Sequence, residues 1–225
     1  MNTFSKLLIA SFESHRNDEL AKGMSSYMKD NFDYLGIYAV QRKELTKKVL
    51  SGQKVTLESL QEVVTDLWQR SEREYQYAAL DISYMFCKKM DANWIPFWEK
   101  ILLQKSWWDS VDGIASNCLG ASMSKLSIAE QREHAERWAS HEAMWLNRTA
   151  IIFQLKYRDK INSELLFDMI VSHVDSKEFF IRKAAGWALR ELSKTQAPVA
   201  AQFIADYKDV LSNLTIREAS KYLKS

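Results

Sequence analysis

The sequence predicts an all-α protein, organised as an α-solenoid of antiparallel helix pairs with a concave binding face. Only six glycines and two prolines interrupt the 225 residues, which leaves little turn material for β-hairpins. Alanine, leucine, lysine, glutamate and glutamine dominate the stretches between them, and these residues favour helices. Segments of similar pattern also recur at offsets of 33, 34 and 37 residues. Such periods are typical of solenoids built from helix pairs.

The individual helices follow from apolar periodicity and from their start and stop signals. Thr56 can cap one helix, and Ser127 with Glu130 three residues later predicts a capping box at the start of another. The connections are short, so neighbouring helices are expected to pack antiparallel. The expected helices span residues 3–14, 17–28, 41–50, 56–69, 73–88, 92–104, 107–120, 127–138, 141–156, 162–173, 177–193, 196–206 and 215–223.

A degenerate repeat relates several of these helices. Arg148 aligns with Arg182 at an offset of 34 residues. Two earlier segments fit the same repeat, and each begins with an aromatic residue, Tyr75 in one and Trp108 in the other. In a solenoid each helix pair buries its apolar face on the next pair. The second helices then line a concave surface that can bind a protein or a nucleic acid.

One domain spanning residues 1–225 is expected, because domains commonly hold about 100–200 residues. No segment approaches the roughly 18 unbroken apolar residues that a bilayer span needs, so no membrane helix is expected. The apolar start of the chain is followed closely by Glu13 and Asp18, which favours a first helix over a signal peptide. Cys87 and Cys118 lie on apolar helical faces, which favours buried, reduced thiols and a cytoplasmic location.

The net charge of +2 and the sequence pI near 8.4 do not by themselves indicate nucleic-acid binding. Basic residues nevertheless gather in short segments, which are either solvated helix faces or contacts for phosphates. They are Arg42, Lys43, Lys47, Lys48, Arg70, Arg73, Arg182, Lys183, Arg190 and Lys194.

No metal site and no cofactor are expected. The four histidines show no ligand spacing, and the chain lacks a phosphate-binding glycine loop, a nucleophile elbow and the paired cysteines of a zinc site. The histidines are His15, His134, His141 and His173.

The strongest chemical signal is a tryptophan and a carboxylate one helical turn apart, Trp108 and Asp112. An indole face can hold a cation, and an ionised carboxylate can stabilise positive charge that develops nearby. The pair could therefore serve a reaction that passes through a cationic intermediate. The alternative is that Trp108 is a packing residue and that Asp112 only interacts with the positive end of the helix dipole.

Two later helices add charged and aromatic residues to the same predicted surface. Arg148 precedes an apolar run, where it can meet a phosphate or pair with Asp112 in a structural ion pair. Trp187 follows Gly186, and a glycine inside a helix indicates that something approaches the backbone closely. That neighbour is either a ligand or another helix.

Several separate stretches of the chain match one known family in the same order. They are Tyr27–Ile37, Leu67–Trp68, Glu74–Ala79, Trp107–Asp112, Trp145–Ile151 and Phe180–Glu191. Through these stretches nearly the whole chain resembles the AlkD-type DNA alkylation-repair glycosylases. The resemblance implies that the repeats are HEAT-like.

The resemblance also implies roles for individual residues. In that family the matching aspartate is catalytic, and the matching arginine and tryptophans flank the lesion, so these roles carry over to Asp112, Arg148, Trp108 and Trp187. Tyr27 matches a third aromatic of the same cleft. The DNA-binding residues expected are Tyr27, Lys29, Arg42, Lys43, Arg148, Arg182, Lys183 and Arg190. The implied partner is double-stranded DNA with alkylated bases, bound by a monomer.

The implied activity is excision of positively charged alkylated purines, such as 3-methyladenine and 7-methylguanine. A cationic base departs without a general acid, so the protein has to stabilise an oxocarbenium-like sugar and supply water, which a nearby carboxylate can do. The resemblance implies that the base is not enclosed in a pocket. The alternative is a non-catalytic HEAT-like scaffold that binds distorted DNA or a protein partner.

Overall fold

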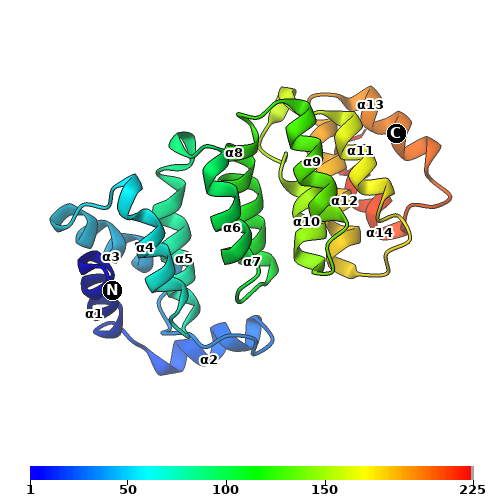
Figure 1. Ribbon diagram of the computed structural model, residues 1–225. Coiled ribbons are helices and arrows are strands. Elements are labelled where there is room, and N and C mark those ends of the chain that lie inside the picture. The colour runs from blue at the N-terminus through cyan, green and yellow to red at the C-terminus, as the bar shows by residue number, and fades with distance from the viewer. Residues whose placement is uncertain (224–225) are drawn as a thin grey trace. The chain divides into compact units, whose positions relative to one another are not determined.

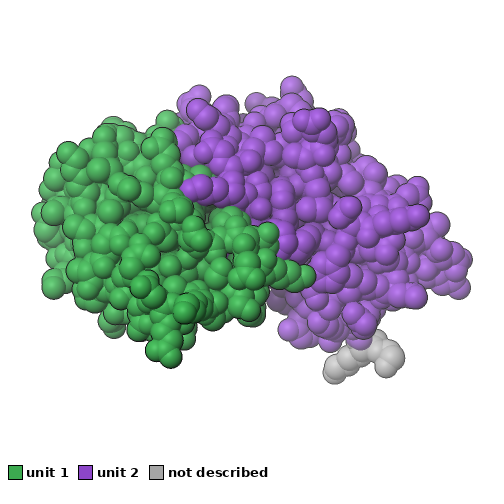
Figure 2. Space-filling model, turned by 90° about the horizontal axis from the view of Figure 1, so that it is seen from below, with its two compact units in different colours: residues 1–89 green, residues 90–225 purple. Residues whose placement is uncertain are grey.

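The computed structural model describes residues 1–223, which form helices and no strands (Figure 1). The all-α prediction is therefore confirmed for this part of the chain. The chain divides into two compact units, Met1–Lys89 and Met90–Ser225, which Figure 2 colours separately. The expectation of one domain over residues 1–225 stays a prediction. None of the helices within residues 1–223 has the length and apolar character that crossing a bilayer requires.

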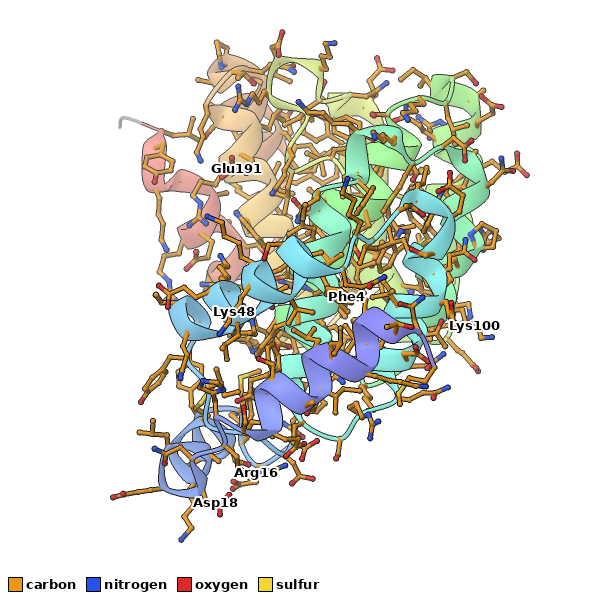
Figure 3. All side chains as sticks on the ribbon, turned by 90° about the vertical axis from the view of Figure 1, so that its left-hand side faces the viewer. Phe4, Arg16, Asp18, Lys48, Lys100 and Glu191 are labelled. Carbon is orange, nitrogen blue, oxygen red and sulfur yellow. The ribbon has the colours of Figure 1, made fainter. Side chains whose placement is uncertain are left out.

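Unit 1 is built on α1, α4 and α5, whose apolar residues form its core. Phe4, labelled in Figure 3, is fully buried on α1, whereas Lys48 on α3 is exposed. The helices of this unit are α1 (Thr3–Glu13), α2 (Asp18–Tyr27), α3 (Ala39–Gly52), α4 (Leu57–Trp68), α5 (Arg73–Tyr84) and a 3-10 helix at Cys87–Lys89.

A buried carboxylate organises the loop after α2. Glu74 accepts hydrogen bonds from the backbone N–H groups of Leu35, Gly36 and Ile37 at 2.9, 2.9 and 3.1 Å. Gly36 has φ of +81°, and a Cβ on it would stand 2.1 Å from the carbonyl oxygen of Asn17, so only glycine fits there. Glu74 thus joins two of the stretches that carry the family resemblance, Tyr27–Ile37 and Glu74–Ala79.

Unit 2 is built around α10 and α12. In this unit α10 packs on α7, α9 and α12, and α12 packs on α13 and α14. Its helices are a 3-10 helix at Ala92–Trp94, α6 (Ile95–Leu102), α7 (Trp108–Gly113), a π-helical segment at Ile114–Leu119, α8 (Gly120–Met123), α9 (Ile128–Ala139), α10 (Met144–Ile152), a 3-10 helix at Arg158–Lys160, α11 (Ser163–Val171), α12 (Phe179–Ser193), α13 (Ala197–Asp206), α14 (Asn213–Ala219) and a 3-10 helix at Ser220–Tyr222.

The helix predicted at residues 107–120 contains an irregularity that the sequence did not predict. Its middle, Ile114–Leu119, is π-helical, and α8 continues the helix beyond it. Ser116 donates to the carbonyl of Asp112 at 2.7 Å, and Asn117 donates to the carbonyl of Gly113 at 3.0 Å. The side chains thus bond two carbonyls where the regular pattern breaks, directly after Asp112. Segments of this kind often occur at functional sites.

Several local predictions are confirmed. Thr56 caps α4, and Ser127 forms a capping box with Glu130 at the start of α9. Cys87 and Cys118 are buried thiols. The helix predicted to begin at residue 141 begins instead at Met144, because residues 140–143 form the corner between α9 and α10. Asn147 holds this corner by donating to the carbonyls of residues 138, 139 and 141.

Candidate active site

An ion pair between α7 and α10 forms the centre of the candidate site. Nε of Arg148 donates to Oδ1 of Asp112 at 2.7 Å, and Nη2 donates to Oδ2 at 2.8 Å. The side chain of Arg148 is 3% exposed and that of Asp112 is 17% exposed. Asp112 therefore keeps an open side toward solvent, and the arginine beneath it fixes both carboxylate oxygens.

The remaining hydrogen-bonding edge of Arg148 is also occupied. Nη1 donates to the backbone carbonyl of Phe180, and the guanidinium carbon lies 6.0 Å from the centre of the Phe180 ring. Arg148 thus joins α10 to α7 and to the start of α12. Of the two alternatives for this residue, the placement favours the ion pair with Asp112 over a direct phosphate contact.

Three aromatic rings pack together, and one of them, Phe180, contacts this arginine. Trp107 lies 5.8 Å from Trp145 and 5.3 Å from Phe180, and Trp145 lies 5.0 Å from Phe180, measured between ring centres. No role was predicted for these three residues, although all of them fall in stretches that carry the family resemblance. Phe180 links this cluster to the ion pair, because its backbone carbonyl accepts a hydrogen bond from Arg148.

Trp108 occupies the first position of α7, one turn before Asp112. It is 36% exposed, so its ring is available to a ligand on the same side of the helix as the carboxylate. Trp108 and Asp112 thus lie on α7, and the ion pair joins Asp112 to Arg148 on α10.

Burial and ion pairing act on the Asp112 carboxyl in opposite directions. Burial raises the pKa of Asp112 above its ordinary value, while the hydrogen bonds and the positive charge of Arg148 oppose the rise. The neighbouring charge of Asp109 adds to the rise. The net direction is upward, because the loss of hydration is the largest of these effects.

Trp187 lies on α12, where it is half-buried. It follows Phe180 by seven positions, which places both residues on one face of the helix, two turns apart. Gly186 beside it faces α14: a Cβ at this position would lie 2.6 Å from Cβ of Glu218 and 2.8 Å from the carbonyl oxygen of Thr215. The close neighbour predicted at Gly186 is a helix.

Comparison with known proteins supplies the family. The model of the DNA alkylation repair enzyme family matches residues 8–223. The chain belongs to this family. A solved structure described as a predicted DNA alkylation repair enzyme from Enterococcus faecalis is 34% identical, with a TM-score of 0.84, and the likeness covers 93% of this chain and 97% of that chain. No curated protein matches the chain.

Membership of the DNA alkylation repair enzymes confirms two of the expectations. The fold is an α-solenoid of HEAT-like repeats, as the sequence predicted. The protein has a role in DNA alkylation repair, and this role implies that it binds DNA.

The basic residues of α12 that the sequence assigned to DNA hold contacts inside unit 2. Lys183 and Arg190 pair with Glu218 at 2.8 and 3.2 Å, and Arg182 donates to the carbonyl of Ser176 at 2.7 Å. Lys221 is a further partner of Glu218. Lys183 and Lys221 lower the pKa of Glu218 to about 2. Three cations share one carboxylate here, so the cluster keeps a net positive charge.

The predicted DNA contacts in unit 1 differ in how accessible they are. Tyr27, at the end of α2, is 77% exposed, and Lys29 and Lys43 are exposed as well. Arg42 is only 8% exposed, donates to Asp81 at 3.1 Å, and stacks over the Tyr77 ring at 4.9 Å. Its guanidinium is thus engaged within unit 1, and we leave it out of the interface proposed below.

The described residues offer no obvious place for a metal ion. Within residues 1–223, no three side chains of histidine, cysteine, aspartate or glutamate are grouped so that they could hold one.

Proposed function

We propose that this protein is a DNA glycosylase that excises positively charged alkylated purines, of the 3-methyladenine and 7-methylguanine type, from duplex DNA. The observation that carries the proposal is the carboxylate of Asp112, which Arg148 fixes through both oxygens while one side stays open to solvent. The exposed Trp108 ring one turn away supports it. Membership of the alkylation repair family supplies the context.

The reaction breaks the bond between C1′ of the deoxyribose and the base nitrogen. A base that carries a positive charge takes the bonding electron pair and leaves as a neutral molecule, so no proton has to be supplied. The sugar is left as an oxocarbenium-like cation. The negative charge of Asp112 stabilises this cation, and the carboxylate also orients the water that attacks C1′ and accepts its proton.

The aromatic residues and the arginine have supporting roles in this scheme. Trp108 and Trp187 lie against the deoxyribose and the DNA backbone. Each ring face there stabilises the developing cation by about 0.5–2 kcal/mol. Arg148 is a positioning residue, because it holds Asp112 in one orientation and favours its ionised form. Contacts to phosphates come from exposed or partly exposed cations, and we assign this role to Lys29, Lys43, Arg182, Lys183 and Arg190.

Recognition in this scheme depends on the charge of the lesion and on the DNA backbone, not on a pocket around the base. Enzymes that flip a base into a pocket can excise neutral lesions because they read the edge of the base. This protein should therefore release 3-methyladenine and 7-methylguanine, and release uracil or 1,N6-ethenoadenine slowly or not at all.

Release of free bases tests the proposal against the alternative of a non-catalytic scaffold. Purified protein is incubated with alkylated duplex DNA, and free methylpurines are measured by chromatography against a sample without protein. The proposal predicts methylpurines well above spontaneous loss. Binding of alkylated DNA without release would support the scaffold, and efficient release of uracil would contradict the mechanism.

A further inference from the structure

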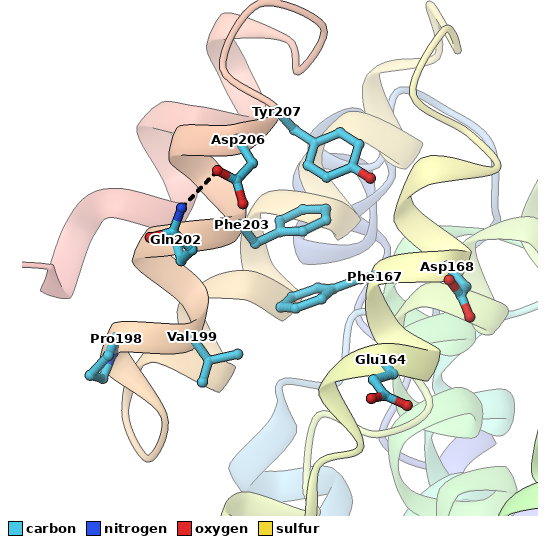
Figure 4. Close-up of a pocket in the computed structure, with 9 residues that line it drawn as sticks. All are labelled: Glu164, Phe167, Asp168, Pro198, Val199, Gln202, Phe203, Asp206 and Tyr207. Atoms are coloured by element: carbon cyan, nitrogen blue, oxygen red, sulfur yellow. Dashed lines mark hydrogen bonds between the residues drawn. The ribbon is translucent and has the colours of Figure 1, made fainter.

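A groove between α11 and α13 in unit 2 lies outside the candidate active site. Its volume is about 690 Å³, and none of its lining residues belongs to the Asp112 site or to the aromatic cluster around Arg148. Figure 4 shows residues of the two helices facing each other across this groove. Such a volume is sufficient to hold a small ligand or several side chains of a peptide.

The floor of the groove is aromatic. The rings of Phe167 and Phe203 stack at 4.0 Å with an angle of 9° between their planes, and Tyr207 stacks on Phe203 at 4.6 Å. Figure 4 shows these three rings between the helices. Val199 is 40% exposed at the same groove. The groove therefore offers the edges of aromatic rings and an aliphatic surface to a ligand.

The polar lining of the groove is acidic. Glu164, Asp168 and Asp206 line it, together with Gln202, and neither lysine nor arginine is among its lining residues. Arg132 pairs with Asp168 at 2.6 Å, and Gln202 donates to Asp206 at 2.7 Å. Within residues 1–223, the exposed carboxylate of Glu164 has no salt bridge or hydrogen bond. The groove thus carries a net negative charge in a protein whose total charge is +2.

We propose that this groove binds a basic, partly apolar segment of a partner protein. Guanidinium groups pair with carboxylates, so an arginine-bearing segment matches the acidic lining of the groove. Aliphatic side chains of the same segment would cover Val199 and the ring edges. DNA does not match, because the phosphates would be repelled by the carboxylates. The proposal does not depend on the glycosylase activity.

Synthetic peptides test this proposal on the full-length protein. A labelled peptide that alternates arginine with leucine is titrated with the protein and followed by fluorescence anisotropy. Two matched peptides replace every arginine with glutamate or every leucine with serine. We expect each replacement to weaken binding by about tenfold or more, and added salt to weaken the arginine–leucine complex. Equal binding of all three peptides, or no binding of the first, would overturn the proposal.

Matched variants locate the binding to the groove. Glu164→Lys/Asp206→Lys reverses two exposed charges of the groove, and Val199→Ser removes apolar surface from it. The control, Glu133→Lys/Glu142→Lys, reverses two exposed charges elsewhere in unit 2. We expect about a tenfold loss for the groove charge variant, a smaller loss for Val199→Ser, and a change within about twofold for the control. Circular dichroism verifies that each variant is folded.

Three results with these variants would contradict the proposal. Equal losses in the groove charge variant and the control would show that only total charge matters. A loss of DNA affinity in the groove charge variant alone would make the groove a DNA contact. A change from dimer to monomer in that variant, measured by sedimentation, would make the occupant a second copy of the chain.

Discussion

The carboxyl of Asp112 is subject to competing effects that set its protonation. Burial favours the neutral acid, whereas Arg148 donates two hydrogen bonds that favour the anion. Because burial is the larger effect, the pKa of Asp112 lies above its ordinary value of about 3.9. The proposed chemistry needs the anion, so the protonation of this one group should be visible in the rate.

The pH dependence of excision follows from the direction of this shift. A raised pKa means that Asp112 takes up its proton at a higher pH than an ordinary aspartate does. The single-turnover rate of 7-methylguanine release, corrected for spontaneous loss, should therefore fall as the pH decreases, with a midpoint above the ordinary aspartate value. A rate that stays constant down to that value would show that the ionisation of Asp112 does not limit excision.

Arg148→Gln removes the partner that opposes this shift. The pKa of Asp112 should rise further, so the acid limb of the pH–rate profile, where the rate falls as the pH decreases, should move to higher pH. The excision rate at neutral pH should fall by about tenfold or more. Loss of the pair should also reduce the free energy of unfolding by about 2–3 kcal/mol, somewhat less than for a fully buried pair. The pH–rate profiles of the two proteins measure the first effect, and urea unfolding measures the second.

A double-variant comparison separates positioning from mere stability. In a protein that already carries Asp112→Asn, adding Arg148→Gln should change the residual rate little, because the carboxylate that the arginine positions is gone. An unchanged acid limb in Arg148→Gln would assign Arg148 a purely structural role.

At the level of single residues, the sequence predicted which side chains are candidates for the chemistry but not their environments. Asp112 and Arg148 were singled out, and their pairing was one of two alternatives. Arg42 and Lys43 show the difference. They are adjacent basic residues, yet Arg42 is buried against Asp81 and Lys43 is exposed. A charge on a helix face does not reveal which partner a different helix will bring to it. For the same reason the contacts among Trp107, Trp145 and Phe180 could not be predicted.

At the level of elements, the packing of α12 on α14 depends on the absence of a side chain at Gly186. Glu218 and Thr215 of α14 occupy the space that a Cβ would need. The sequence predicted a close approach here, because glycine is unfavourable inside a helix. Which neighbour makes the approach required the structure.

Gly186→Ala should therefore destabilise the protein, although alanine is the better helix former. The added methyl group should force α14 away and cost about 1–3 kcal/mol of unfolding free energy, measured by urea denaturation. Gly23→Ala is the matched control, because a Cβ at Gly23 on α2 would meet nothing within 4 Å. That variant should gain about 0.5–1 kcal/mol. A stable Gly186→Ala protein would contradict the packing of α12 on α14.

The π-helical segment after Asp112 shows a limit of sequence patterns. The apolar periodicity of residues 107–120 predicted one helix, and a helix is present, but a short π-helical stretch shifts the pattern too little to be noticed. Ser116 and Asn117 bond the carbonyls at this point, and serine and asparagine at such positions occur in regular helices too.

At the level of the whole molecule, the helical class and the repeat family were predictable and the internal division was not. Sparse glycine and proline predicted an all-α chain, and the ordered motifs predicted the family. The boundary between the two units falls between Lys89 and Met90, where no proline, glycine or serine marks a linker. That boundary follows from which helices contact one another, and these contacts cannot be read from a single sequence.

Asp112→Asn tests the central claim most directly, because it keeps the shape of the side chain and removes its charge. The measurement is the single-turnover rate of 7-methylguanine release from duplex DNA, together with the affinity for the same DNA. We predict a rate lower by about 10²–10³, with the DNA affinity kept or increased because a carboxylate that repels phosphates is gone. A variant that releases 7-methylguanine at the rate of the unmodified protein would show that Asp112 is a structural residue.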